Sequence, residues 1–217
     1  PPRSTLFPYT TLFRSQRYIV NQTDEDSYST YLRALTNWDY SDQNVRSTLE
    51  AIWQEAYSTI MNINVIIDNI ESDVLKEEGR VLPQNEYMML KGEMLAVRAM
   101  IHFDLLRLFG PIYSKNPEER GIPYNESTKT DVLAILPANV VLNDYIIRDL
   151  EIALGLLAES DPVITDGPMT VYNTDNMDNS MRYRQLRLNY YATSLLLSRA
   201  YLWEGNYTKA AEYTEKL

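Results

Sequence analysis

The chain has 217 residues, 45% of them hydrophobic, which is enough for a folded protein with a sizeable core. Its formal net charge of −10 argues against nucleic acid as a partner, because binding to a phosphate backbone needs clustered Lys and Arg. The absence of cysteine excludes thiolate metal sites, disulfides and cysteine nucleophiles. Only seven glycines, and long stretches without glycine or proline, favour helices over a glycine-rich α/β enzyme. No apolar run approaches the roughly 20 residues of a membrane-spanning helix.

Residues 1–15 differ in character from the acidic, polar sequence that follows them, and they contain two Thr-Leu-Phe units. From Thr5 onward this segment resembles the in-frame translation of a DNA sequencing adapter. We therefore expect it to be an artefact joined to a truncated native domain, residues 16–217; the alternative is a genuine β-prone arm. Leaving out Arg3 and Arg14 reduces the basic residues from 20 to 18 against 30 acidic ones, so the net charge becomes −12.

A first long helix is predicted between Asn44 and Glu71. Its apolar residues recur in steps of four and three along one stripe: Leu49, Trp53, Ala56, Ile60, Ile63, Ile67 and Ile70. Ser47 and Glu50 have the spacing of a capping box, unless the helix begins a turn earlier and includes them.

A second helix is predicted after the polar turn around Gly79 and Pro83. It carries apolar residues on two faces, so we expect it to be sandwiched between neighbours: Leu90, Met94, Val97, Ile101, Leu105 and Leu108 on one, and Met89, Ala96, Met100 and Phe103 on the other. Gly110 followed by Pro111 predicts its end, because glycine tolerates a left-handed conformation and proline cannot continue the helix.

Two loops flank a predicted third helix. Residues 115–137 form the first loop, and residues 138–159 the helix, with Leu142, Ile146, Leu150, Ala153 and Leu157 as its stripe. Residues 163–180 form a second loop rich in Asp, Asn, Pro and Gly. Its hard oxygen ligands lack EF-hand spacing, so no metal site is predicted from Asp175, Asp178 and Asn179.

The chain ends in a predicted helical hairpin. One helix covers Arg184 to Trp203, and a second runs from Tyr207 to Leu217. Several residues have the spacing of a tetratricopeptide repeat: Leu197, Ser198, Ala200, Tyr201, Gly205, Tyr207 and Ala210. Because one repeat cannot bury its own apolar face, the earlier helices must stack on it. The sequence therefore predicts an all-α protein, a tetratricopeptide-like superhelix of helical repeats with long connecting loops.

Four blocks in order resemble the N-terminal part of the SusD/RagB family across roughly Tyr28 to Leu217. The main block, Gly92 to Ile112, is similar to the family signature in Gly92, Glu93, Arg98, Ala99, Phe103, Asp104, Leu105, Arg107, Leu108, Phe109 and Gly110. The preceding helix resembles the family in Trp53, Tyr57, Ile60 and Asn64. Later blocks do so in Asp149, Leu150 and Ala153, and in Ala192, Leu195, Arg199, Ala200, Tyr201 and Leu202.

The resemblance implies a non-enzymatic receptor without a cofactor, on the extracellular face of the bacterial outer membrane. Such receptors bind oligosaccharides or polysaccharides and deliver them to a SusC-type TonB-dependent transporter. The lipidated cysteine that anchors them is absent here, so we expect the native N-terminus, and also the family's variable C-terminal region, to lie outside this sequence.

The candidate ligand-binding residues precede the first long helix, in the sequence RALTNWDYSD, which begins at Arg33. Aromatic faces stack on sugar rings, and planar amide, carboxylate or guanidinium groups hydrogen-bond their hydroxyls. The segment supplies both kinds of group in Arg33, Asn37, Trp38, Asp39 and Tyr40. The family also has ligand contacts in this region. The alternative is that Trp38 only packs the segment onto the repeats.

Two rival functions remain open at the level of sequence. A tetratricopeptide stack is also typical of peptide-binding or scaffold proteins, and an α-helical glycosidase would need paired carboxylates across a cleft. The charged residues of the second helix, Glu93, Arg98, Asp104 and Arg107, are more typical of ion pairing within a helical core than of catalysis. His102 has no second histidine, which favours a hydrogen-bonded packing role over metal binding.

Overall fold

The computed structural model describes residues 27–37, 39–74, 79, 81–129, 132–169, 171 and 182–217. Within these residues the regular structure is helical, apart from an isolated bridge between Arg120 and Pro137, so the predicted all-α class is confirmed. The helices are α2 (Ser27–Thr36), α3 (Gln43–Val74), α4 (Gln84–Phe109), α5 (Ala138–Val140), the π-helix η1 (Val141–Ile147), α6 (Arg148–Ser160), α7 (Val163–Asp166), the 3-10 helix η2 (Arg184–Leu186), α8 (Tyr190–Glu204) and α9 (Tyr207–Thr214).

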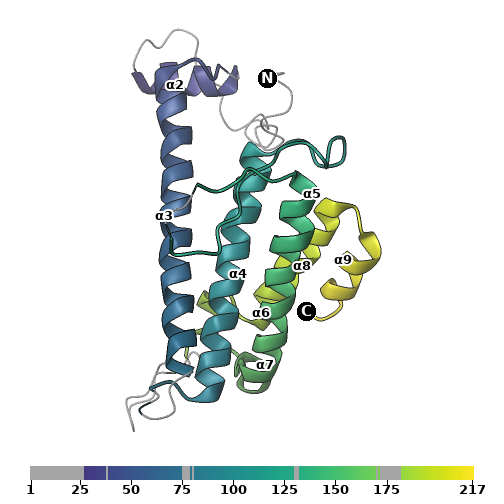
Figure 1. Ribbon diagram of the computed structural model, residues 1–217. Coiled ribbons are helices and arrows are strands. Elements are labelled where there is room, and N and C mark those ends of the chain that lie inside the picture. The colour runs from purple at the N-terminus through teal and green to yellow at the C-terminus, as the bar shows by residue number, and fades with distance from the viewer. Residues whose placement is uncertain are drawn as a thin grey trace.

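The long helices run side by side in alternating directions (Figure 1). Helix α4 packs against α3 on one side and α6 on the other, so the predicted sandwiched helix is confirmed. The α8–α9 hairpin covers α6, and α2 lies across the N-terminal end of α3. None of the described helices is both long enough and apolar enough to cross a membrane.

Helix α3 begins one turn earlier than the capping-box spacing suggests. The Asp42 carboxylate accepts the N–H groups of Asn44 at 2.9 Å and Val45 at 3.1 Å, so it caps the helix and leaves Ser47 and Glu50 inside it. The predicted stripe is confirmed. Towards the C-terminal end of α3 its residues are buried: Ile60, Ile63, Ile67 and Ile70. Nearer the N-terminal end, Trp53 and Ala56 are partly buried against the core.

The end of α4 is where predicted, but Gly110 is extended, with φ −82° and ψ 177°, instead of left-handed. Its N–H donates to the Leu106 carbonyl at 2.9 Å. A Cβ atom on Gly110 would lie 2.4 Å from that same carbonyl oxygen. The glycine is therefore required for space rather than for a positive φ.

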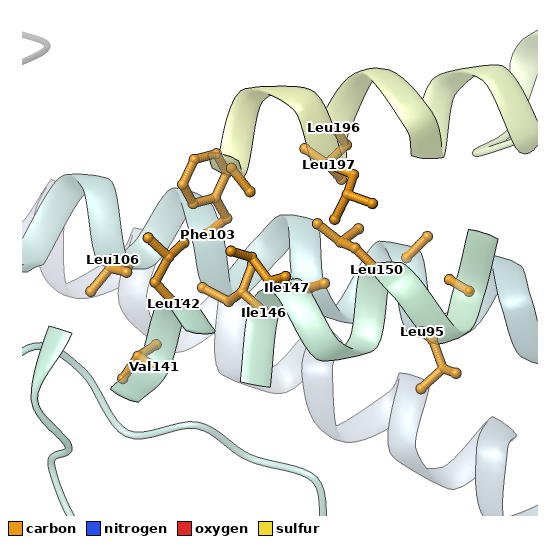
Figure 2. Packing of buried hydrophobic residues seen from close by; sticks show 14 of the residues in the cluster. Leu95, Phe103, Leu106, Val141, Leu142, Ile146, Ile147, Leu150, Leu196 and Leu197 are labelled. Carbon is orange, nitrogen blue, oxygen red and sulfur yellow. The ribbon is translucent and has the colours of Figure 1, made fainter. Parts of the chain in front are cut away.

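The predicted third helix is continuous from α5 through η1 to α6, and its stripe is fully buried: Leu142, Ile146, Leu150, Ala153 and Leu157. The stripe meets apolar side chains of α4 and α8, among them Leu95, Phe103 and Leu197 (Figure 2). The π-helical turns of η1 are not predicted, because apolar spacings of three and four suit both kinds of helix.

The helix predicted from Arg184 is wrong in its first turn. Arg184 forms the short helix η2, the chain then becomes extended, and Asn189 caps α8 by accepting the Ala192 N–H at 2.8 Å. The cause is tertiary, because the fully buried Arg184 side chain binds Asp161 through two hydrogen bonds of 2.8 and 2.9 Å.

The closing hairpin is confirmed. Gly205 has φ +93° and turns the chain between α8 and α9. Small residues bring the two helices together, because the hydroxyls of Ser194 and Ser198 donate to the carbonyls of Tyr213 and Ala210, each at 2.8 Å.

The predicted second loop contains the short helix α7. Asp175, Asp178 and Asn179, from which no metal site is predicted, lie outside the described residues.

Candidate functional site

The turn between α2 and α3, residues 37–42, is built by local hydrogen bonds, and we call it the pre-helix turn. The N–H of Asp39 donates to the Ala34 carbonyl at 2.8 Å, which closes the end of α2. The Asp39 carboxylate accepts the N–H of Ser41 at 3.0 Å and its hydroxyl at 2.5 Å. This arrangement is the side-chain turn that Asp commonly forms with the backbone two residues on.

Four of the five predicted ligand-binding residues are described by the structure, and they directly precede the N-terminal end of α3. Arg33 lies half-buried in the last turn of α2, Asn37 and Asp39 are exposed, and Tyr40 is half-buried. Burial raises the pKa of Tyr40 to about 12, so its hydroxyl is a neutral hydrogen-bonding group at physiological pH. Trp38 lies outside the described residues. The role of the five in binding remains a prediction.

About two to three turns along α3 from the pre-helix turn, α3 and the last residue of α4 line an open surface hollow of about 260 Å³. Its lining is Leu49, Glu50, Trp53, Gln54 and Phe109. Sequence reasoning missed this site, because it assigned Trp53 to the core stripe of the helix. Trp53 is only partly buried, so one part of the residue contacts the core and another faces the hollow.

The Trp53 ring is held between two other aromatic rings. The Phe109 ring meets it edge-on, with centroids 5.0 Å apart and planes at 87°, and the Tyr57 ring lies at 4.8 Å. Such arrangements are favoured by the charge distribution of aromatic rings. The Tyr57 hydroxyl in turn donates to the Pro123 carbonyl at 2.7 Å. Trp53 is therefore oriented by contacts that originate in a distant part of the chain.

Pro123 belongs to an extended segment, residues 121–129, which crosses α3 and α4 and which we call the strap (Figure 1). The Asn64 amide of α3 donates to two strap carbonyls, those of Asn125 at 3.1 Å and Ser127 at 3.2 Å. Near the end of the strap, the Thr128 hydroxyl donates to Asp68 at 2.8 Å. The predicted long loop therefore includes a segment fixed along the surface of α3.

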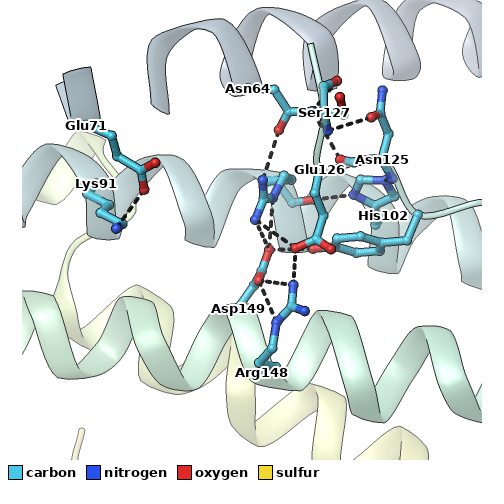
Figure 3. Close-up of polar contacts among 11 residues, drawn as sticks. Asn64, Glu71, Lys91, His102, Asn125, Glu126, Ser127, Arg148 and Asp149 are labelled. Atoms are coloured by element: carbon cyan, nitrogen blue, oxygen red, sulfur yellow. Dashed lines mark hydrogen bonds and ion pairs between the residues drawn. The ribbon is translucent and has the colours of Figure 1, made fainter. Parts of the chain in front are cut away.

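A buried polar network centred on Arg98 joins α3, α4, α6 and the strap. Figure 3 shows Asn64, His102, Arg148 and Asp149 within it. Arg98 donates to Asp149 at 2.9 Å and to the Asn64 side-chain oxygen at 3.0 Å, and the Tyr124 hydroxyl donates to Asp149 at 2.7 Å. Arg148 adds a second cation beside Asp149, at 2.8 Å. The Asp149 carboxylate thus has partners on each side, as a buried charge requires.

His102 lies in the same network and is completely buried. Its Nε2 accepts the N–H of Asn125 at 3.0 Å, so Nδ1 carries the proton and donates to the Arg98 carbonyl at 2.9 Å. The ring stacks on Tyr124 with centroids 3.8 Å apart. Burial lowers the pKa of His102 to about 4, and the nearby Arg98 charge acts in the same direction. The predicted hydrogen-bonded packing role is confirmed.

A second buried cluster involves Glu93 of α4. Glu93 pairs with Arg184, which also binds Asp161, and the exposed Arg187 lies 3.6 Å from Glu93. Towards the end of the helix, Asp104 pairs with Arg107 at 2.9 Å. The predicted ion pairing of these residues is confirmed. Among the described residues, no group of three or more His, Asp or Glu side chains is arranged to hold a metal ion.

Comparison with known protein families gives a match over residues 9–166 to the SusD-like family described as starch-binding and associating with the outer membrane. The chain belongs to this SusD-like family. The matched range includes the pre-helix turn, the hollow, the strap and the network around Arg98. The predicted resemblance is therefore confirmed.

Two solved structures from Bacteroides vulgatus resemble the SusD-like chain. One is described as a SusD-like carbohydrate binding protein, with 25% identity and a TM-score of 0.55 over 76% of this chain and 30% of that one. The other is assigned to sugar binding, with 26% identity and a TM-score of 0.54 over 76% of this chain and 32% of that one. The chain thus spans about a third of the length of these structures. Comparison with curated proteins gives no match.

Proposed function

We propose that this chain is the N-terminal part of a receptor that binds glycans at the outer surface of the bacterial outer membrane and delivers them to a SusC-type TonB-dependent transporter. The observation that carries the proposal is the family match over residues 9–166, because it includes the segment with the predicted ligand-binding residues. The family's description as starch-binding supports a carbohydrate ligand, and its association with the outer membrane supports the location. A lipid anchor outside this sequence would hold the receptor there.

The chemistry of the pre-helix turn suits this ligand. Asn37 and Asp39 are exposed, so the turn offers an amide and a carboxylate to solvent within three positions. Planar groups of this kind form paired hydrogen bonds with neighbouring sugar hydroxyls. With Trp38 as an aromatic face, the turn has the components of a sugar-binding site.

Ion pairing in the core supports binding without catalysis. A glycosidase needs two carboxyl groups facing each other across the scissile bond. The buried carboxylates Glu93, Asp149 and Asp161 are each paired with arginine instead. Hydrolysis of an oligosaccharide by the purified chain would contradict this part of the proposal.

A glycan array tests the proposal directly. We expect the purified chain to bind neutral polysaccharides, soluble starch among them, and Trp38→Ala to migrate faster than wild type in a starch affinity gel. Equal migration of the two proteins would remove Trp38 from the site. An array without any bound glycan, together with binding to a peptide library, would favour the alternative of a peptide-binding or scaffold protein. Co-purification with a co-expressed SusC-type transporter tests the delivery step.

A further inference from the structure

We propose that the hollow formed by Leu49, Glu50, Trp53, Gln54 and Phe109 is a second sugar subsite, which binds one neutral pyranose unit of the same glycan chain. This inference rests on the proposed glycan-binding function and adds a site to it. The volume of about 260 Å³ is just below the range of pockets for drug-sized ligands, which suits a single sugar unit.

The lining of the hollow is mostly apolar, and Glu50 and Gln54 add polar groups to it. Leu49 and Trp53 lie one helical turn apart on α3, and Glu50 and Gln54 lie one turn apart on the adjacent strip of the same helix. A pyranose ring has a face of C–H groups and a rim of hydroxyls. Its C–H face fits against the Trp53 ring, while its hydroxyls reach the Glu50 carboxylate and the Gln54 amide.

The polar part of the lining is available for a ligand. The Glu50 carboxylate lies 3.9 Å from the Arg46 guanidinium, and both side chains are more than half exposed. An exposed pair of this kind contributes little to stability, so sugar hydroxyls can take the place of this contact. The Glu50 charge also disfavours carboxylated or sulfated sugars by like-charge repulsion, which is why the structure assigns a neutral unit to the hollow.

The aromatic part of the lining is rigid before any ligand arrives. Trp53 is fixed by Phe109 and by Tyr57, and Tyr57 is fixed by its hydrogen bond to Pro123 of the strap and by an edge contact with the His102 ring at 6.0 Å. A platform that is already ordered loses little conformational entropy on binding. This preorganisation distinguishes Trp53 from an exposed aromatic residue on a mobile loop.

The hollow also lies within reach of the pre-helix turn. Helix α3 begins at Gln43, and Glu50 and Trp53 follow seven and ten residues later. At about 1.5 Å per residue, these separations correspond to about 10 to 15 Å along the helix axis. Two subsites at this spacing suit non-adjacent units of one oligosaccharide, and simultaneous contact with both would raise the overall affinity.

The test uses exposed residues, so that the variants keep their fold. Gln54→Ala and Glu50→Ala should each weaken binding of soluble starch by the 217-residue chain about three- to tenfold, as expected for one or two lost hydrogen bonds. Trp53→Phe, which keeps an aromatic ring in the core, should also weaken it. Matched controls on the same helix, Glu55→Ala and Asn62→Ala, lie outside the lining of the hollow and should bind like wild type.

The outcomes separate the two proposals. If Trp38→Ala or Tyr40→Ala abolishes starch binding while Glu50→Ala and Gln54→Ala keep wild-type affinity, the hollow is not a subsite and the proposed function stands. Tighter binding of polygalacturonate than of starch would overturn the assignment of a neutral sugar. If the wild-type chain binds no glycan, the proposed function fails and the subsite fails with it.

Discussion

The network around Arg98 and the pre-helix turn contain the same types of side chain in opposite environments. Arg98, Asp149 and Asn64 are 5%, 1% and 1% exposed, and the hydrogen bonds of Arg98 to Asn64 and Asp149 join positions 34 and 51 apart in the sequence. In the pre-helix turn, Asp39 is exposed, and its hydrogen bonds to Ala34 and Ser41 join positions five and two apart in the sequence. Polar groups of the first kind hold helices together, whereas those of the second kind remain in contact with solvent, where a ligand can bind them.

The largest expected effect is on the buried network. Arg98→Ala leaves the Asp149 carboxylate buried without its main partner, so we expect a loss of about 3 to 5 kcal/mol in the free energy of unfolding, measured with urea. The control is Arg46→Ala, which removes an exposed arginine and should change stability by less than about 0.5 kcal/mol. A loss of similar size in both variants would contradict the structural role of the network.

The next effect is a pH dependence at His102. Its pKa falls from 6.5 to about 4 on folding, so between these values the unfolded chain binds a proton that the folded chain does not. Stability from this group is therefore complete above pH 6.5 and decreases by about 3 kcal/mol as the pH falls to 4.

His102→Gln removes this titration. Urea unfolding at several pH values should show a flatter loss of stability in the variant than in wild type between pH 6.5 and 4. Parallel curves for the two proteins would mean that His102 is not held neutral in the folded state.

A smaller effect is expected where the strap meets the aromatic residues. Tyr57→Phe keeps the ring but removes the hydroxyl that donates to Pro123, so the free energy of unfolding should fall by about 1 kcal/mol. The fluorescence of Trp53, in a background in which Trp38 and Trp203 are Phe, should become easier to quench with acrylamide. Unchanged quenching would show that the hydroxyl does not hold the Trp53 environment in place.

The smallest effect on stability is expected in the pre-helix turn. Asn37→Ala replaces an exposed side chain, so the unfolding free energy should change by less than about 0.5 kcal/mol. Its affinity for starch should nevertheless fall several-fold. Lower stability with full affinity would mean that Asn37, like Asn64, stabilises the fold and does not bind the ligand.

Sequence periodicity predicted those parts of the fold that depend on local spacing. The apolar stripes of α3 and of the helix around Leu150 follow from spacings of three and four residues. The hairpin turn follows from Gly205 at its position in the repeat. The start of α8 could not be predicted in this way, because Arg184 leaves the helix to bind Asp161 and Glu93 from other elements. The position of the strap likewise depends on partners far away in the sequence.

Of the candidate site, one part could likewise be predicted from local sequence and another could not. The composition of the pre-helix turn was visible in the sequence, because its residue types are unusual just before an apolar stripe. The hollow was not, because Trp53 belongs to the core stripe by its spacing, and Phe109 joins it only through the packing of α4 on α3. Periodicity assigns a residue to one face of a helix, so it cannot show that part of its side chain is exposed.

The most direct test of glycan binding at the N-terminal end of α3 is isothermal titration calorimetry with a starch-derived oligosaccharide. Wild type should be compared with the double variant Trp38→Ala and Tyr40→Ala, after circular dichroism has shown that both have the same helix content. Binding by wild type and a loss of affinity of tenfold or more in the variant, equivalent to about 1.4 kcal/mol, is the predicted result. Equal affinity of the two proteins would contradict the assignment of the pre-helix turn as the glycan-binding site.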